Sequence, residues 1–146
     1  MLSSILVAAV AGGVTFFVLG FIIYGVILDP LVMKPNVIAY DGLMKDPPSW
    51  IPLILGNLVS GLLLAYIIDR LPGVRSFTSG AMTGGVVWFL MSLAFQLMFL
   101  AFMNLTKSYV PVIADVVGSA VMGAIGGGVI AAVMGMMDKR TAVIEA

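Results

Sequence analysis

Four polar side chains stand out because each lies inside a long apolar stretch: Tyr24, Asn57, Gln96 and Asp115. A polar side chain in hydrocarbon costs free energy, so it either hydrogen-bonds to a neighbouring helix or serves a function. Counted from the nearer end of each stretch at about 1.5 Å per residue, the four lie roughly 6 to 11 Å deep. We expect them to form one polar layer.

Asp115 differs from the other three because it is a carboxylate with no basic residue in any apolar stretch. For Tyr24, Asn57 and Gln96 we favour hydrogen bonds that hold helices together. For Asp115 two interpretations stay open. It is either a scaffold group near the start of its helix or the centre of a pocket for a ligand, cation or proton.

Small residues accompany each polar residue at helical spacing. Asp115, for example, shares a face with Ser119, Gly123 and Gly127, which follow at intervals of four residues. Rows of small residues allow membrane helices to approach closely, so the polar layer should face the interior. The glycines expected at helix contacts are Gly12, Gly13, Gly20, Gly61, Gly80, Gly84, Gly123, Gly127 and Gly135.

The amino-acid composition indicates that these helices lie in a membrane. Of 146 residues, 62% are hydrophobic and only 10% are charged, and the mean hydropathy is +1.19. A soluble domain carries roughly a quarter charged residues. The chain is therefore predicted to be an integral membrane protein with the lipid bilayer as its main partner.

The chain is poor in the residues on which metal-binding, nucleic-acid-binding and catalytic proteins usually depend. The chain has no Cys and no His, so common ligands for haem, zinc, copper and iron–sulfur clusters are missing, and we expect no metal or cofactor. Seven basic residues balance seven acidic ones, which argues against nucleic-acid binding. One carboxylate, two amides and a phenol make a thin catalytic set, so we do not expect an enzyme.

Four apolar stretches, at about 5–28, 50–68, 78–103 and 109–137, are each long enough to cross a membrane. They predict an all-α fold, a bundle of four transmembrane helices forming a single domain over residues 1–146. The connection 29–49 contains four prolines and is predicted not to be a continuous helix. It could be an ordered surface loop or a lid over the outer face.

The chain also contains a candidate internal repeat. Gly12-Gly-Val and Gly84-Gly-Val open similar segments, and Trp50-Ile-Pro52 resembles Tyr109-Val-Pro111. A helical hairpin could therefore occur twice, over 1–70 and 78–140, with both copies running in the same direction.

Basic residues predict the orientation, because Lys and Arg in short loops resist translocation. One side holds Arg70, Arg75, Lys139 and Arg140, and the other holds Lys34, Lys45 and Lys107. This count places both termini in the cytoplasm.

Several segments give the chain a family resemblance. Val7-Ala-Ala-Val-Ala11 leading to Phe17-Val-Leu-Gly20 and Tyr24, Asn57 in Leu-Gly-Asn-Leu, and Gly80 at the start of a helix resemble small bacterial four-span membrane proteins classed as a domain of unknown function. The resemblance implies a bacterial inner membrane and no known activity.

Two functions remain as hypotheses. Abundant small residues favour an accessory subunit of a membrane complex or a small homo-oligomer, in which other membrane helices are the partners. The alternative is a small transporter or ligand-binding protein with a polar pocket in the outer half, centred on Asp115.

Overall fold

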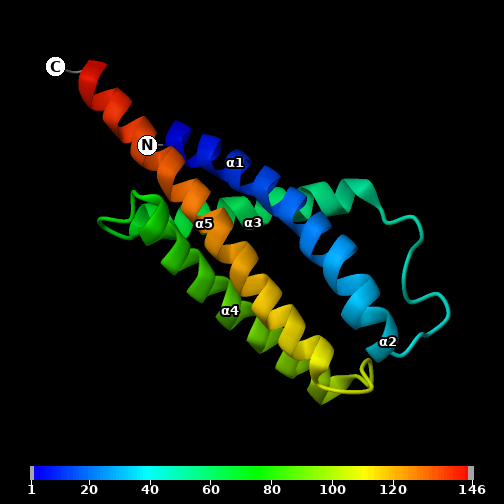
Figure 1. Cartoon of the computed structure of the whole chain (residues 1–146). Helices are drawn as coiled ribbons and strands as arrows, with labels where there is room; N and C mark the ends of the chain where they lie inside the picture. The colour runs from blue at the N-terminus through cyan, green and yellow to red at the C-terminus, as the bar shows by residue number, and fades with distance from the viewer. Residues whose placement is uncertain (1, 145–146) are drawn as a thin grey trace.

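The computed structural model describes residues 2–144 and is helical almost throughout (Figure 1). Its elements are α1 (Leu2–Gly20), the π-helix η1 (Phe21–Met33), α2 (Lys34–Asn36), α3 (Trp50–Arg70), α4 (Phe77–Phe102) and α5 (Val110–Ile144). Four helices are long and apolar enough to cross a membrane: Ser3–Asn36, Trp50–Arg70, Phe77–Phe102 and Val110–Arg140. The fold class is the predicted one.

The first membrane helix is longer than expected, because α1, η1 and α2 run on as one helix to Asn36. The prediction that the first membrane helix ends near residue 28 is therefore wrong. Pro30 lies inside the helix, where it supplies no N–H for a helical hydrogen bond. The π-helical stretch around it explains the tolerance, since local widening lets the freed backbone groups find other partners.

The other helices begin and end close to the predicted positions, except that α5 continues past residue 137 to Ile144. Ser76 starts α4 through a capping box. Its side chain accepts a hydrogen bond from the Ser79 N–H, and the Ser79 side chain accepts one from the Ser76 N–H. These bonds satisfy backbone donors that have no partner inside the helix.

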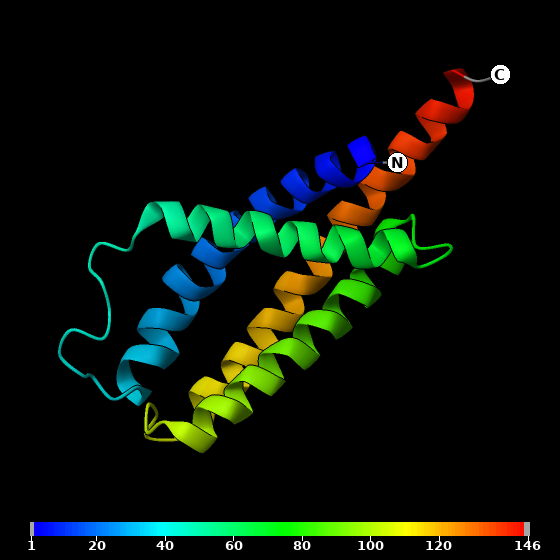
Figure 2. The ribbon, with the colours of Figure 1, turned by 180° about the vertical axis from the view of Figure 1, so that it is seen from behind.

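Helix α5 is the central element. Over an 18-residue membrane-spanning stretch of α5, 44% of the residues are buried, compared with 6% for the corresponding stretch of α4. It contacts α4, α1, α3 and η1. Figure 2 shows α3 crossing the molecule at a steep angle to α4 and α5, and α3 and α4 touch only slightly.

Backbone contact between glycines brings the paired helices together. A Cβ atom on Gly84 would meet the backbone of Gly123 and Gly127 in α5, and one on Gly61 in α3 would meet the backbone of Ala9 and Gly13 in α1. Such close approach is how membrane helices gain dispersion energy without a hydrophobic driving force. The closest helix pairs are therefore α4 with α5 and α1 with α3.

These pairs are the two helical hairpins of the suggested repeat, but their contacts are not equivalent. Gly61 lies nine residues after Pro52, whereas Gly123 lies twelve residues after Pro111. The repeat stays a prediction.

The packed core lies between α1, α3 and α5. Its largest fully buried side chains are Phe16, Leu64, Ile68, Ile130 and Met134. The Trp88 ring of α4 stacks on Phe16 with centroids 5.0 Å apart and planes inclined by 10°. Outside this core, many large apolar side chains point outward, among them Phe21, Leu31, Ile51 and Met82. Four long helices with an apolar exterior are the layout of a multi-pass membrane protein.

The two ends of the bundle are called here the terminal end and the connector end. The terminal end holds the start of α1, the connection 71–76 and the last turns of α5, and the chain termini lie there (Figure 1). At this end Arg75 Nε donates to Asp138 Oδ2 at 2.8 Å, and its guanidinium also binds Asp69 and the Ile68 carbonyl oxygen. Arg75 thus ties α5 to the end of α3.

The connector end holds the segments 37–49 and 103–109. Ile38 N donates to the Leu105 carbonyl oxygen, and Lys107 N donates to the Asn36 carbonyl oxygen, both at 2.8 Å. The Tyr40 hydroxyl adds a hydrogen bond to the Asn104 carbonyl oxygen at 2.7 Å. The two hairpins are therefore joined by hydrogen bonds at this end too.

Candidate polar pocket

Asp115 lies in the second turn of α5 and is half-buried against α4. Ser92 Oγ of α4 donates to Asp115 Oδ2 at 2.6 Å, a short distance typical of a hydroxyl bound to a carboxylate. Within residues 2–144 no Lys or Arg forms a salt bridge with Asp115. The carboxylate therefore keeps acceptor sites for another group.

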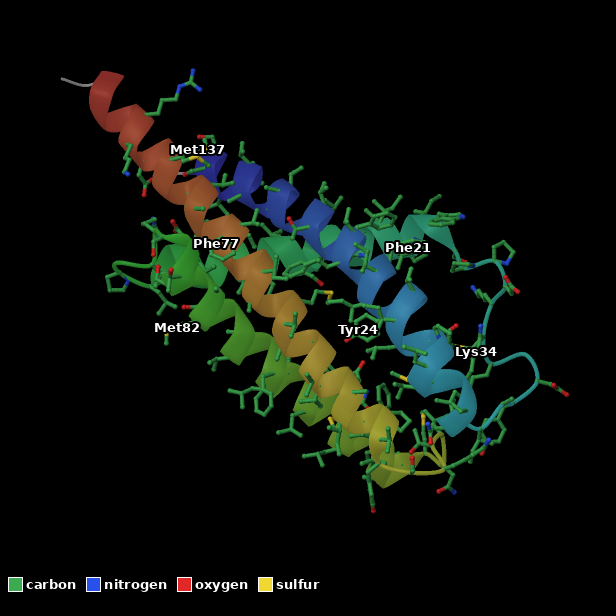
Figure 3. The ribbon with its side chains drawn as sticks, in the orientation of Figure 1. Phe21, Tyr24, Lys34, Phe77, Met82 and Met137 are labelled. Atoms are coloured by element: carbon green, nitrogen blue, oxygen red, sulfur yellow. The ribbon has the colours of Figure 1, made fainter. Side chains whose placement is uncertain are left out.

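Tyr24 reaches the same region from η1. Its hydroxyl lies 2.7 Å from Ser119 Oγ, where either group can be the donor, and 3.4 Å from the Asp115 carbonyl oxygen. Figure 3 shows Tyr24 between η1 and α5. Ser119 is buried, so this contact satisfies a hydroxyl that would otherwise lack a partner.

Gln96 and Asp115 line one pocket, whose volume is about 330 Å³. Its walls come from α4 (Trp88, Met91, Ser92, Phe95, Gln96 and Phe99) and from α5 (Asp115 and Ser119). The Gln96 amide makes no hydrogen bond with any of the residues that the structure describes. The pocket is thus lined by a carboxylate, an amide, two hydroxyls and three aromatic rings.

Asn57 does not join the other three polar residues. Its Nδ2 donates to the Leu53 carbonyl oxygen of its own helix at 2.8 Å, and it does not line the pocket. Asn57 therefore takes no part in the pocket, and the expectation of one layer at a common depth stays a prediction. Asn57 lies away from the pocket because of the inclination of α3, which packs through its second half, where Gly61, Leu64, Ala65 and Ile68 are buried.

The packing glycines behave as a set, with one exception. Added Cβ atoms would meet neighbours at Gly12, Gly13, Gly61, Gly80, Gly84, Gly123, Gly127 and Gly135. Gly20 has no neighbouring atom within 4 Å of such a Cβ, so it is not a helix contact. Gly20 is the last residue of α1, about two turns beyond the contact of Gly13 with α3, and the inclined α3 no longer lies against α1 there.

Part of this site was not predicted from the sequence. Ser119 was considered only as a small residue and not as a hydrogen-bonding partner, and the roles of Ser92, Phe95 and Phe99 were not predicted. Spacing gave the relevant signal, because Ser92 lies four residues before Gln96 and Ser119 four after Asp115. Residues four apart share a helix face.

The segment 29–49 does not contribute to the pocket walls. Its first part is helical, and residues 37–40 bind the connection between α4 and α5. Residues 41–49 are exposed. No residue of this segment lines the pocket, so the structure gives the lid hypothesis no support.

The pocket's donor set suits binding better than metal capture. No group of three or more His, Cys, Asp or Glu side chains comes together anywhere in the described part of the chain. One carboxylate beside an amide and hydroxyls can hold a cation or a hydrogen-bond donor.

Comparison with known proteins adds no assignment. No protein-family profile, curated protein or solved structure matches the chain.

Proposed function

We propose that this protein binds a small solute in the pocket between α4 and α5, with Asp115 as its principal recognition group. The observation that carries the proposal is a half-buried carboxylate that keeps free acceptor sites and opens into a pocket. A charged group inside a membrane helix is retained at a cost in free energy, and such groups commonly mark ligand or ion sites.

The contacts that the small residues make within the chain support a binding function over an accessory role. Gly80, Gly84, Gly123 and Gly127 contact one another within the chain, so they are not available for association with another protein. A pocket with one carboxylate and no His or Cys also favours binding over catalysis.

An accessory subunit or homo-oligomer is the second candidate, and one observation favours it. The first turns of α3 are exposed on all sides, with Trp50 and Ile51 prominent, and Gly56 has no neighbour within 4 Å. Another membrane helix could cover this half of α3. Cross-linking in native membranes tests it, and a purely monomeric protein would remove this candidate.

The membrane setting follows the sequence argument. We place the protein in a bacterial inner membrane with both termini in the cytoplasm, as the resemblance and the Lys and Arg count imply. The connector end, and with it the pocket, then faces the outer half of the bilayer.

Water access to the pocket tests the proposal, and the absence of Cys makes single-thiol variants straightforward. Charged methanethiosulfonates react with an ionised thiol, which requires water. Gln96→Cys should react, whereas Met98→Cys, two residues along α4 and 55% exposed on the apolar surface, should not. Equal resistance of the two variants would refute a water-accessible pocket.

Substitutions at Asp115 separate binding from scaffolding. Asp115→Asn keeps the size of the side chain and its hydrogen bond with Ser92, so the free energy of unfolding should stay within about 1 kcal/mol of the parent value. Asp115→Leu removes the acceptor and should lower the free energy of unfolding by about 1 to 3 kcal/mol. A binding role requires Asp115→Asn to slow the reaction of a cationic reagent at Gln96→Cys without slowing that of a neutral one. If both reagents react as before, Asp115 does not set the pocket's selectivity.

A further inference from the structure

Among the residues that line the pocket, Asp115 is the only one with an acidic or basic side chain, and Ser92, which donates a hydrogen bond to it, is neutral. A carboxylate poorly solvated by water attracts a cation more strongly than the same group at an aqueous surface. With one carboxyl side chain and no basic side chain in its lining, the pocket favours a positively charged ligand.

Aromatic rings form much of the remaining wall. Trp88, Phe95 and Phe99 line the pocket with Asp115, and aromatic faces attract cations, ammonium groups above all. Trp88 is held in place by its stacking on Phe16. A divalent metal ion prefers several oxygen ligands from carboxylates and carbonyls, and only one carboxylate is present. The wall chemistry favours an organic ammonium ion.

The position of the pocket suggests an apolar remainder for the ligand. Helices η1 and α4 both pack on α5 and have few or no close backbone contacts with each other. Phe95 and Phe99 are 54% and 45% exposed. An apolar substituent attached to a cation at Asp115 could extend along these rings toward the lipid.

We infer that the pocket takes an ammonium ion that carries an apolar chain, with the cation on Asp115 and the chain along Phe95 and Phe99. This inference rests on the proposed binding function and names its ligand class. Such a group could come from a free amphiphilic amine or from an amine-bearing phospholipid. A free amine fits better, because no basic side chain lines the pocket to neutralise a lipid phosphate.

Tryptophan fluorescence provides the assay. The chain has two Trp residues, so Trp50→Phe leaves Trp88, which lines the pocket, as the only one. This variant in maltoside micelles is titrated with n-octylamine, with 1-octanol as the neutral analogue and with dihexanoyl phosphatidylethanolamine as the lipid source. Asp115→Asn is compared with Asp41→Asn, which removes the same charge from the exposed segment 41–49.

We expect n-octylamine to change the Trp88 emission with a Kd at least about tenfold lower than that of 1-octanol, and Asp115→Asn to raise that Kd by at least about tenfold. Asp41→Asn should leave it unchanged. Binding of the phosphatidylethanolamine with the same dependence on Asp115 would retain the ammonium class and assign lipid as its source.

Equal affinity for the amine and the alcohol, or an equal effect of the two Asn variants, would overturn the inference. The outcome is distinguishable from failure of the proposed function. If Gln96→Cys reacts with charged reagents but no amine binds, the pocket exists and the ligand class is wrong. If Gln96→Cys is as unreactive as Met98→Cys, the water-accessible pocket of the proposed function is refuted.

Discussion

Replacing Gly84 by Ala tests the closest helix contact in the protein. A Cβ atom there would lie 2.9 Å from Gly127 Cα and 3.1 Å from the Gly123 carbonyl carbon, and closer still to the Gly123 carbonyl oxygen. All three atoms belong to backbone, so no side chain can rotate away and α4 must separate from α5. Overpacking of this kind costs about 1 to 3 kcal/mol, and the rigid neighbours favour the upper end.

The intrinsic effect of the substitution has the opposite sign. Ala is more favourable than Gly in a helix by about 1 kcal/mol, so the expected net loss for Gly84→Ala is about 2 kcal/mol. Gly56→Ala is the matched control, because an added Cβ there meets nothing within 4 Å. It should gain up to about 1 kcal/mol. The two variants should therefore differ by about 3 kcal/mol in the free energy of unfolding.

The measurement is unfolding in mixed micelles with an increasing fraction of dodecyl sulfate, followed by the helical circular dichroism signal. The control removes effects on the unfolded chain that any Gly-to-Ala substitution has. If Gly84→Ala were as stable as Gly56→Ala, the backbone approach of α4 and α5 would be disproved.

Two further predictions concern the ends of the bundle. Arg75→Lys should lower the unfolding free energy by about 1 to 2 kcal/mol, because one ammonium cannot reach the acceptors that the planar guanidinium binds on both helices; Arg70→Lys, at an exposed site, should cost less, and equal losses would argue against the Arg75 network. In intact cells an impermeant thiol reagent should label Met44→Cys, whose parent side chain is 86% exposed, and not Lys139→Cys; the reverse pattern would invert the proposed orientation.

The spans were predictable from sequence because hydropathy and length decide whether a helix can cross a bilayer. The contact glycines were largely predictable too, since Gly84 and Gly127 lie in rows of small residues at helical spacing. What composition cannot supply is the angle between helices. That angle is set by the whole interface, and the inclined α3 carries Asn57 away from the pocket.

Local helix type was the second unpredictable feature. Residue spacing was converted to direction by assuming one turn geometry, whereas the chain changes to a π-helix at Phe21. This change separates Tyr24 from the face of Gly20 and directs it to Ser119. Pro30 was a visible sign of irregularity, but Pro can end a helix or be accommodated within it.

The hydrogen bonds at the two ends restrict how the halves of this protein can move. Asn36 and Lys107 join the hairpins at one end, and Arg75 and Asp138 join them at the other, so rocking one hairpin against the other, as in alternating access, would break bonds at either pivot. Bowing of η1 would break none of them, and a π-helix that contains Pro30 is where a helix bends most easily. A bend of η1 would act first on the hydrogen bond between the Tyr24 and Ser119 hydroxyls, which joins this helix to α5 beside the pocket.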